Sequence, residues 1–360
     1  MRRDVPGVVV RFGREEQDAV TRVLASGRVV QGEEVAAFEH EFAALVEGRP
    51  CVAVNSGTSA LHLGLLAAGV GPGDEVVVPS FSFAASANAV AITGARPVFA
   101  DIDPDTFCLD VAAVEAAITP RTVGVMAVHL FGQPAGADQL RLLTERLGLL
   151  LFEDACQAHG AASSGTPAGA VGQLAAFSFY ATKNMTTGEG GMVVCADEAI
   201  ARKVRLLRNQ GMEQRYRNEI VGLNNRMTDL AAAIGRVQLD SLALWNAARN
   251  AVAKRYDEEL RGVRTPTVAP GVTHVYHQYT IRSPQRERLR AHLHDLGVGA
   301  EVYYPVPIHR LPAYDAGEHL DHTEAAAREV LSLPIRPTLT DDDVSHVIST
   351  VNQFSESTHG

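Results

Sequence analysis

Residues 149–160, LLLFEDACQAHG, contain an apolar run that ends in two adjacent acids, Glu153 and Asp154. An apolar run without polar alternation is typical of a strand covered on both faces, as in a parallel sheet. In open α/β sheets, ligands bind at the carboxyl ends of the strands. Asp154 is therefore predicted to be either a carboxylate that holds a ligand, such as a protonated ring nitrogen, or the N-cap of a following helix.

Similar apolar runs occur before and after this segment. Further strands are expected at residues 51–54, 75–78, 97–100, 123–128, 171–179 and 192–195, with helical patterns between most of them. Repeated βα units predict an α/β domain with a largely parallel sheet. Residues 230–261 predict one long helix or a helix pair. We expect a domain boundary near residue 245, which divides the chain into a large domain (1–245, with an N-terminal arm) and a smaller α+β domain (246–360).

Composition excludes several classes of protein. The formal net charge is −10, which argues against nucleic acid as a main partner. No segment approaches 18 uninterrupted apolar residues, and no apolar stretch follows the N-terminal arginines, so neither a membrane span nor a secretory signal is expected. The four cysteines form no metal-binding pattern and predict free thiols in a reducing cytoplasm. The histidine pairs at 274/277 and 292/294 lack supporting ligands, so no metal site is predicted.

Lysine is rare in this chain. Only three of the 32 basic residues are lysines: Lys183, Lys203 and Lys254. Arginine cannot be deprotonated near neutral pH and so cannot act as a nucleophilic amine. The last two lysines lie among charged residues at helical spacing, which is typical of a solvated helix face. Lys183 lies in residues 177–191, FSFYATKNMTTGEGG, whose glycines let the backbone approach a ligand closely, so we favour a covalent role over a structural one.

Residues 55–61, NSGTSAL, follow a predicted strand and open a predicted helix. Free backbone N–H groups at such a helix start, beside Gly57 and neighbouring hydroxyls, can bind a phosphate. The simpler alternative is N-capping by Ser56 or Thr58. Residues 222–227, GLNNRM, can be a turn with an Asx cap and need no function on their own.

Together these segments resemble the DegT/DnrJ/EryC1/StrS family of sugar aminotransferases, in the fold type I group of pyridoxal-phosphate enzymes. The resemblance covers nearly the whole chain and includes, in order, QG at 31–32, NSGTSAL, PSFSF at 79–83, VHLFGQP at 128–134, EDACQAHGA, the lysine segment, GLNNRM, YYPVPIH at 303–309 and SLP at 332–334. It implies an aspartate aminotransferase-like large domain with a mostly parallel seven-stranded sheet, plus a smaller C-terminal α+β domain. It also implies pyridoxal 5'-phosphate as cofactor.

The resemblance assigns roles at the reacting end of the cofactor. Lys183 matches the lysine that forms the Schiff base, and Asp154 matches the carboxylate that keeps the pyridine nitrogen protonated. Gln157 matches the residue that reaches the phenolic oxygen. Phe83 matches the aromatic residue that stacks on the ring.

At the phosphate end, Gly57, Thr58 and Ser178 match phosphate-binding residues. Asn224 matches an asparagine that reaches the phosphate of the neighbouring subunit, which implies a homodimer with shared sites. One departure from the family pattern is Asn225, which stands where an aromatic residue is usual. The other is Cys156, which stands where alanine is common.

The implied reaction is a ping-pong transamination through a Lys183 aldimine, from glutamate or glutamine to a nucleotide-linked keto-deoxy sugar. Residues 186–191, TTGEGG, favour members that act at C4, of 4-keto-6-deoxy sugars. His159, Tyr303 and His309 are candidates for sugar contacts or for structural roles. The alternatives are a C3 sugar aminotransferase, a cyclitol (scyllo-inosose-type) aminotransferase, a sugar dehydratase and a non-catalytic binding protein. The dehydrating lyases carry histidine at the lysine position, so Lys183 argues against that alternative.

Overall fold

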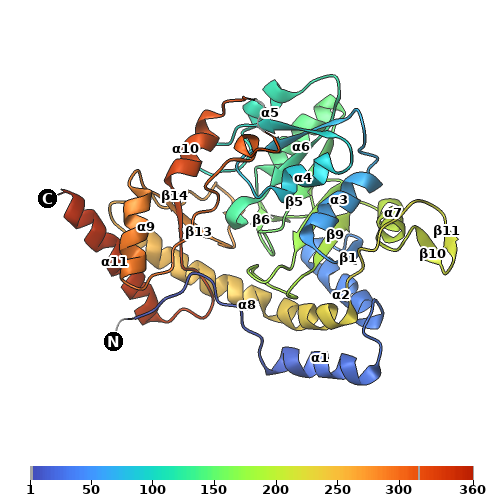
Figure 1. Cartoon of the computed structure of the whole chain (residues 1–360), viewed down its shortest axis with the longest axis horizontal. Helices are drawn as coiled ribbons and strands as arrows, with labels where there is room; N and C mark the ends of the chain where they lie inside the picture. The colour runs from blue at the N-terminus through green and yellow to red at the C-terminus, as the bar shows by residue number, and fades with distance from the viewer. Residues whose placement is uncertain (1–2, 315–316, 360) are drawn as a thin grey trace.

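The computed structural model describes residues 3–314 and 317–359 of the chain and is built around one central sheet (Figure 1). Its seven strands are β1 (Cys51–Val54), β2 (Glu75–Pro79), β3 (Arg96–Ala100), β4 (Thr122–Val128), β5 (Leu150–Asp154), β8 (Leu174–Ser178) and β9 (Gly191–Cys195). Their order is β1-β9-β8-β5-β4-β2-β3, and β9 alone runs antiparallel to its neighbours. The predicted mostly parallel seven-stranded sheet is confirmed.

The strands lack polar alternation because both faces of the sheet are buried. In β9, Val193 and Cys195 join one apolar cluster while Met192 and Val194 join another. Successive side chains of a strand point to opposite faces, so each strand contributes to two cores at once. This explains the continuous apolar runs in the sequence.

Helices enclose the sheet. They are α2 (Glu33–Ala43), α3 (Gly57–Ala67), α4 (Ala85–Ala91), α5 (Val111–Ala117), α6 (Ala137–Leu147) and α7 (Glu198–Arg208). The helix α3 packs on β8 and β9, and α6 packs on β4 and β5. The long helix α8 (Asp229–Glu259) packs against α2 on one side and against α1 (Arg14–Ser26) on the other (Figure 1).

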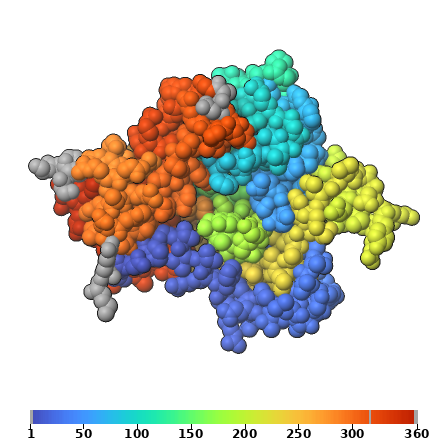
Figure 2. All heavy atoms as spheres, viewed as in Figure 1, coloured from blue at the N-terminus to red at the C-terminus, as the bar shows by residue number. Residues whose placement is uncertain are grey.

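The remaining elements lie at the edges. The hairpin of β10 (Met212–Gln214) and β11 (Arg217–Asn218) projects from the molecule (Figures 1 and 2). A small sheet joins β6 (Ala162–Ser163), β7 (Thr166–Pro167) and β12 (Val272–Thr273). The C-terminal part contains β13 (Tyr279–Arg282), β14 (Val330–Leu333), α9 (Arg286–Asp295), α10 (Asp321–Glu329) and α11 (Asp341–His359). Short 3-10 turns occur at Ala44–Val46, Leu130–Gly132 and Ile308–Arg310.

The region predicted as a long helix or a helix pair is the single helix α8, which passes through residue 245 without a break. A separate apolar cluster formed mostly after residue 250, with Tyr256, Tyr279 and Leu293, supports the predicted smaller domain. Ile308 and Val330 instead pack with the core of the central sheet. The division at residue 245 stays a prediction. Among the described residues, no helix is long and apolar enough to cross a membrane.

Candidate active site

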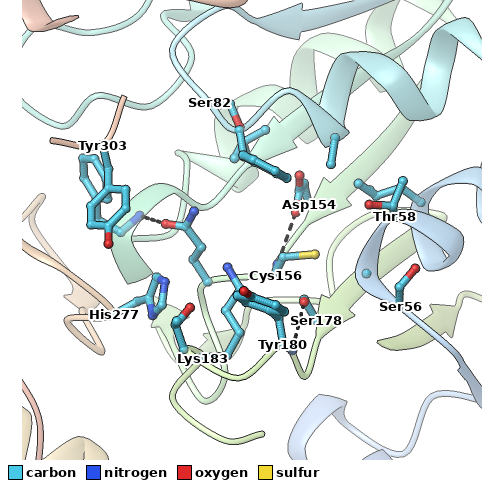
Figure 3. Close-up of a pocket in the computed structure, with 18 of the residues that line it drawn as sticks. Ser56, Thr58, Ser82, Asp154, Cys156, Ser178, Tyr180, Lys183, His277 and Tyr303 are labelled. Carbon is cyan, nitrogen blue, oxygen red and sulfur yellow. Dashed lines mark hydrogen bonds between the residues drawn. The ribbon is translucent and has the colours of Figure 1, made fainter. Parts of the chain in front are cut away.

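A cavity of about 550 Å³ lies beside the carboxyl ends of β4, β5 and β8, where the sequence places its ligand site. Figure 3 shows Lys183 and Asp154 pointing into this space. Ser56 and Thr58 lie on the opposite side from Tyr303 and His277. Seven of the predicted cofactor residues line the cavity: Gly57, Thr58, Phe83, Asp154, Gln157, Ser178 and Lys183.

Asp154 is the last residue of β5, and its carboxylate is held from two sides. Its Oδ2 atom accepts a hydrogen bond of 2.7 Å from Ser86 Oγ, and its Oδ1 atom accepts one of 3.2 Å from the backbone N–H of Cys156. The Ser86 hydroxyl in turn lies 3.0 Å from Ser82 Oγ. Because each carboxylate oxygen can accept further bonds, Asp154 can still bind a cationic group in the cavity.

Lys183 lies in the loop between β8 and β9, where its backbone N–H donates to the carbonyl of Tyr180. Burial lowers the pKa of the Lys183 amine, against the opposing effect of Cys156 and Asp154. A lysine with a lowered pKa has more free amine near neutral pH, which is the form that attacks a carbonyl group. The rare lysine is thus in an environment that suits a nucleophile.

The helix α3 begins directly at the cavity. Ser56 is its N-cap, accepting from the N–H of Ser59 at 3.1 Å, whereas Thr58 faces the cavity. A Cβ atom on Gly57 would lie 2.6 Å from the Cβ of Ser178, so only glycine fits this crossing. The first turn of a helix presents unpaired N–H groups and a partial positive charge, so it can bind an anion such as phosphate.

Gln157 links the cavity floor to the C-terminal part of the chain. Its Oε1 atom accepts from the backbone N–H of Phe131 at 2.8 Å, and its Nε2 atom donates to the hydroxyl of Tyr304 at 3.1 Å. Burial raises the pKa of Tyr304, so its hydroxyl stays protonated. Phe83 lies at the mouth with its ring centroid 6.0 Å from that of Tyr304.

The three candidates for sugar contacts separate in the structure. Tyr303 lines the cavity, but His159 and His309 lie behind its wall. His159 is buried against Phe177 and Phe179, and burial lowers its pKa to about 3. His309 is buried too, and its Nδ1 atom lies 2.6 Å from Ser80 Oγ. Both histidines are thus buried outside the cavity lining, and a contact of either with the sugar stays a prediction.

The predicted intersubunit residue, Asn224, is exposed and lies outside the cavity of its own chain. The neighbouring Asn225 pairs through its backbone, accepting from Asn55 N–H and donating to Arg208 O, both at 3.0 Å. This places GLNNRM beside the NSGTSAL turn. The role of Asn224 toward a second subunit stays a prediction.

Sequence reasoning missed several residues of the site, including Ser82, Ser86, Tyr180, His277 and Tyr304. The sequence predicts no metal site at His277 and gives it no other role, but the residue lines the cavity, and its Nδ1 atom lies 3.2 Å from Asn184 Oδ1. Burial lowers its pKa well below the usual value, with Lys183 contributing, so the ring is neutral. Tyr304 could have been suspected from its place in the YYPVPIH motif, whereas no local signal marks His277.

The chain is similar to known proteins over nearly its whole length. The model of the DegT/DnrJ/EryC1/StrS aminotransferase family matches residues 11–352. The chain is 46% identical to dTDP-3-amino-3,4,6-trideoxy-alpha-D-glucose transaminase of Streptomyces venezuelae, covering 98% of this chain and 95% of that protein. It is 41% identical to GDP-perosamine synthase of Caulobacter vibrioides, covering 97% of this chain and 99% of the relative.

Solved structures show the same likeness. The structure of S. venezuelae DesV in complex with a ketimine intermediate superposes with a TM-score of 0.92 at 44% identity, covering 95% of this chain and 94% of that one. NtdA of Bacillus subtilis, solved with its cofactor PMP bound, gives a TM-score of 0.92 at 32% identity, covering 98% and 85%. The chain therefore belongs to the DegT/DnrJ/EryC1/StrS aminotransferase family and is an aminotransferase.

Proposed function

We propose that this protein transfers an amino group to a ketone of a nucleotide-linked keto-deoxy sugar, with Lys183 as the catalytic amine. The observation that carries the proposal is the placement of two groups in one cavity. Lys183, with its lowered pKa, and Asp154, with its doubly held carboxylate, face the same space. The names of the relatives support a nucleotide sugar as the substrate.

The cofactor is pyridoxal 5'-phosphate, and the residues present fit it. The N-terminus of α3, with Gly57 and Thr58, together with Ser178, would hold the phosphate. Asp154 would hold the protonated ring nitrogen as a charge-assisted hydrogen bond. When bound, the cofactor supplies an electron sink for the carbon that loses a proton.

The remaining side chains of the cavity would orient and shield this chemistry. Gln157 is anchored by Phe131 and Tyr304, and the second N–H of its amide would donate to the phenolic oxygen. Phe83, which lines the cavity, would stack on one face of the ring. Lys183, as a free amine, would carry the proton between the substrate carbon and the cofactor, because its amine lies in the cavity and burial lowers its pKa.

The position of the ketone has two candidates. The name of the S. venezuelae relative places the new amino group at C3, and its 46% identity favours C3 for this chain. The TTGEGG segment after Lys183 favours C4. We propose C3 as the first candidate and C4 as the second. NMR of the product formed from dTDP-linked 3-keto and 4-keto sugars would show which carbon carries the nitrogen.

We further propose glutamate or glutamine as the donor, a ping-pong order of substrates, and a homodimer. The dimer is supported by Asn224, which is exposed and is left without a place in the cavity of its own chain. Equilibrium sedimentation would measure the dimer. Initial rates would be measured at varied concentrations of donor and acceptor and drawn as double-reciprocal plots. Parallel lines would support the ping-pong order, whereas intersecting lines would contradict it.

The central test is Lys183→Ala, with Lys254→Ala as the matched control. Lys254 is exposed and lies 3.9 Å from Glu258 on the surface of α8. The first variant should lose both the visible absorption of the covalently held cofactor and amino transfer to the sugar, and the second should keep both. Retained turnover in Lys183→Ala would refute the assignment of the catalytic amine.

A further inference from the structure

A second, smaller cavity adjoins the first on the other side of the Lys183 segment. It measures about 50 Å³, and it shares Thr182, Lys183, His277 and Gln278 with the larger cavity. A single water needs about 10–15 Å³, so this space can hold a group the size of a carboxylate. The N-terminal segment Gly7–Val9 covers it. In Figure 2 the dark-blue N-terminal part of the chain, to which this segment belongs, lies on the surface between the orange C-terminal part and the yellow-green residues.

Two guanidinium groups line this cavity, from Arg249 on α8 and Arg336 after β14. Arg249 is 6% exposed, and its Nη1 atom donates to the carbonyl of Ile335 at 2.8 Å. Its Nε atom is buried with no hydrogen-bond partner in the described part of the chain. Arg336 donates through Nη1 to the carbonyl of Pro6. Within residues 3–314 and 317–359, neither guanidinium forms an ion pair with a carboxylate.

The charged side chains that line the small cavity are all basic, and the acidic Asp343, which acts on Arg336, lies outside the lining. None of the residues that line it is acidic, and Lys183 adds a third basic group. Burial, together with the nearby Arg336, lowers the pKa of Arg249 to about 10, so the guanidinium is still charged at neutral pH. A buried charge without a counter-ion is costly, and the cost is removed when an anion binds.

We propose that Arg249 and Arg336 form the subsite that binds the α-carboxylate of the amino-acid donor. Guanidinium groups hold carboxylates through charge-assisted hydrogen bonds, and the subsite borders the amine of Lys183. The α-carboxylate of an amino acid is attached to the carbon that carries the amino group. An amino acid anchored here would therefore hold its amino group beside Lys183. This inference rests on the proposed aminotransferase function.

The subsite also separates the two substrates of the reaction. The donor carboxylate would lie in the small cavity, under residues 7–9, and the much larger nucleotide sugar would enter the wide one. Arg249 also crosslinks backbone carbonyls of Tyr276 and Ile335, so its removal can disturb folding. Arg336 is half-buried and is the better position for a test.

The test is calorimetric titration of the holoenzyme with glutarate, a dicarboxylate that has no amino group and cannot react. Arg336→Gln should weaken glutarate binding roughly tenfold or more. The matched control is Arg288→Gln, on the exposed face of α9, which should bind glutarate as the unmodified protein does. Circular dichroism would show that both variants are folded. The concentration of L-glutamate that half-saturates the spectral change of the holoenzyme should rise in parallel for Arg336→Gln.

Unchanged affinity for glutarate in Arg336→Gln would overturn the subsite, as would a lack of glutarate binding to the unmodified holoenzyme at millimolar concentration. These outcomes leave the aminotransferase proposal standing, because that proposal depends on Lys183 and on amino transfer to the sugar. Conversely, an Arg336-dependent glutarate site in a protein that forms no amino sugar would support the subsite and refute the function.

Discussion

Ser86 on α4 donates a 2.7 Å hydrogen bond to Asp154 at the end of β5, although the two residues are 68 positions apart. The hydroxyl is buried, and so is the carboxylate. The bond fixes the plane of the carboxylate that is expected to hold the pyridine nitrogen. Asp154 is therefore positioned by a residue of α4, a helix that lies outside the EDACQAHGA motif.

Replacing Ser86 with alanine should weaken catalysis while the protein stays folded. Hydrogen bonds to charged groups contribute about 1.5–3 kcal/mol, so we expect kcat to fall by roughly ten- to a hundredfold. The measurement is kcat together with the visible spectrum of the holoenzyme across pH, which reports the ring nitrogen. Ser349→Ala, on an exposed position of α11, is the control. Unaltered kcat and spectrum in Ser86→Ala would contradict this role.

Gly57→Ala should weaken cofactor binding and lower stability. The new methyl group would lie 2.6 Å from Ser178 Cβ, and overpacking of this kind costs about 1–3 kcal/mol. Gly71→Ala meets nothing within 4 Å and serves as the matched control. Denaturant unfolding and titration with pyridoxal phosphate give the two readouts. Equal stability of the two variants would argue against the close crossing of α3 and β8.

Glu153 predicts a pH dependence of stability. Burial raises its pKa, but hydrogen bonds from His129 and from the backbone outweigh burial, so the folded-state pKa is lowered. The Nδ1 atom of His129 accepts from Ala135 N–H, so Nε2 carries the proton that is donated to Glu153. A carboxyl group with a lowered folded-state pKa stabilises the fold above its unfolded pKa of about 4.3, and this stabilisation is lost as pH falls through the folded-state value.

Glu153→Gln should therefore lower the free energy of unfolding by about 1.5–3 kcal/mol at pH 7, because it replaces a charged group that accepts hydrogen bonds from His129 and from three backbone N–H groups. The difference from the unmodified protein should shrink below about pH 4. Urea unfolding at several pH values measures it. Glu145→Gln, whose parent side chain is exposed on α6, controls for the change of charge. A pH-independent difference would show that packing, rather than ionisation, accounts for the loss.

Tyr304→Phe should loosen Gln157, because the amide loses the hydroxyl that accepts its hydrogen bond at 3.1 Å. A neutral hydrogen bond contributes about 1 kcal/mol, so cofactor affinity should fall by roughly fivefold. Tyr314→Phe is the control, since its hydroxyl bonds to Asn88 outside the cavity. Equilibrium dialysis of pyridoxal phosphate measures the affinity, and equal affinities in the two variants would refute the link.

The sequence by itself determined the class of fold, because strands buried on both faces must be apolar throughout and helices must lie between parallel strands. It also indicated Lys183, through the scarcity of lysine, and the family, through the order of its motifs. The seven-stranded sheet and the aminotransferase family are confirmed. These features depend on residues that are close together in the sequence, so they can be predicted without a structure.

Only the tertiary structure decided which side chains share the cavity. Tyr304 meets Gln157, and Ser86 meets Asp154, through contacts between distant segments that leave no periodic or local pattern. His159 and His309 belong to the motifs but are buried away from the cavity, whereas His277, which lies outside the motifs, lines it. The neighbours of a side chain depend on how helices and strands pack against one another. The sequence alone does not specify, residue by residue, which way each side chain points in that packing.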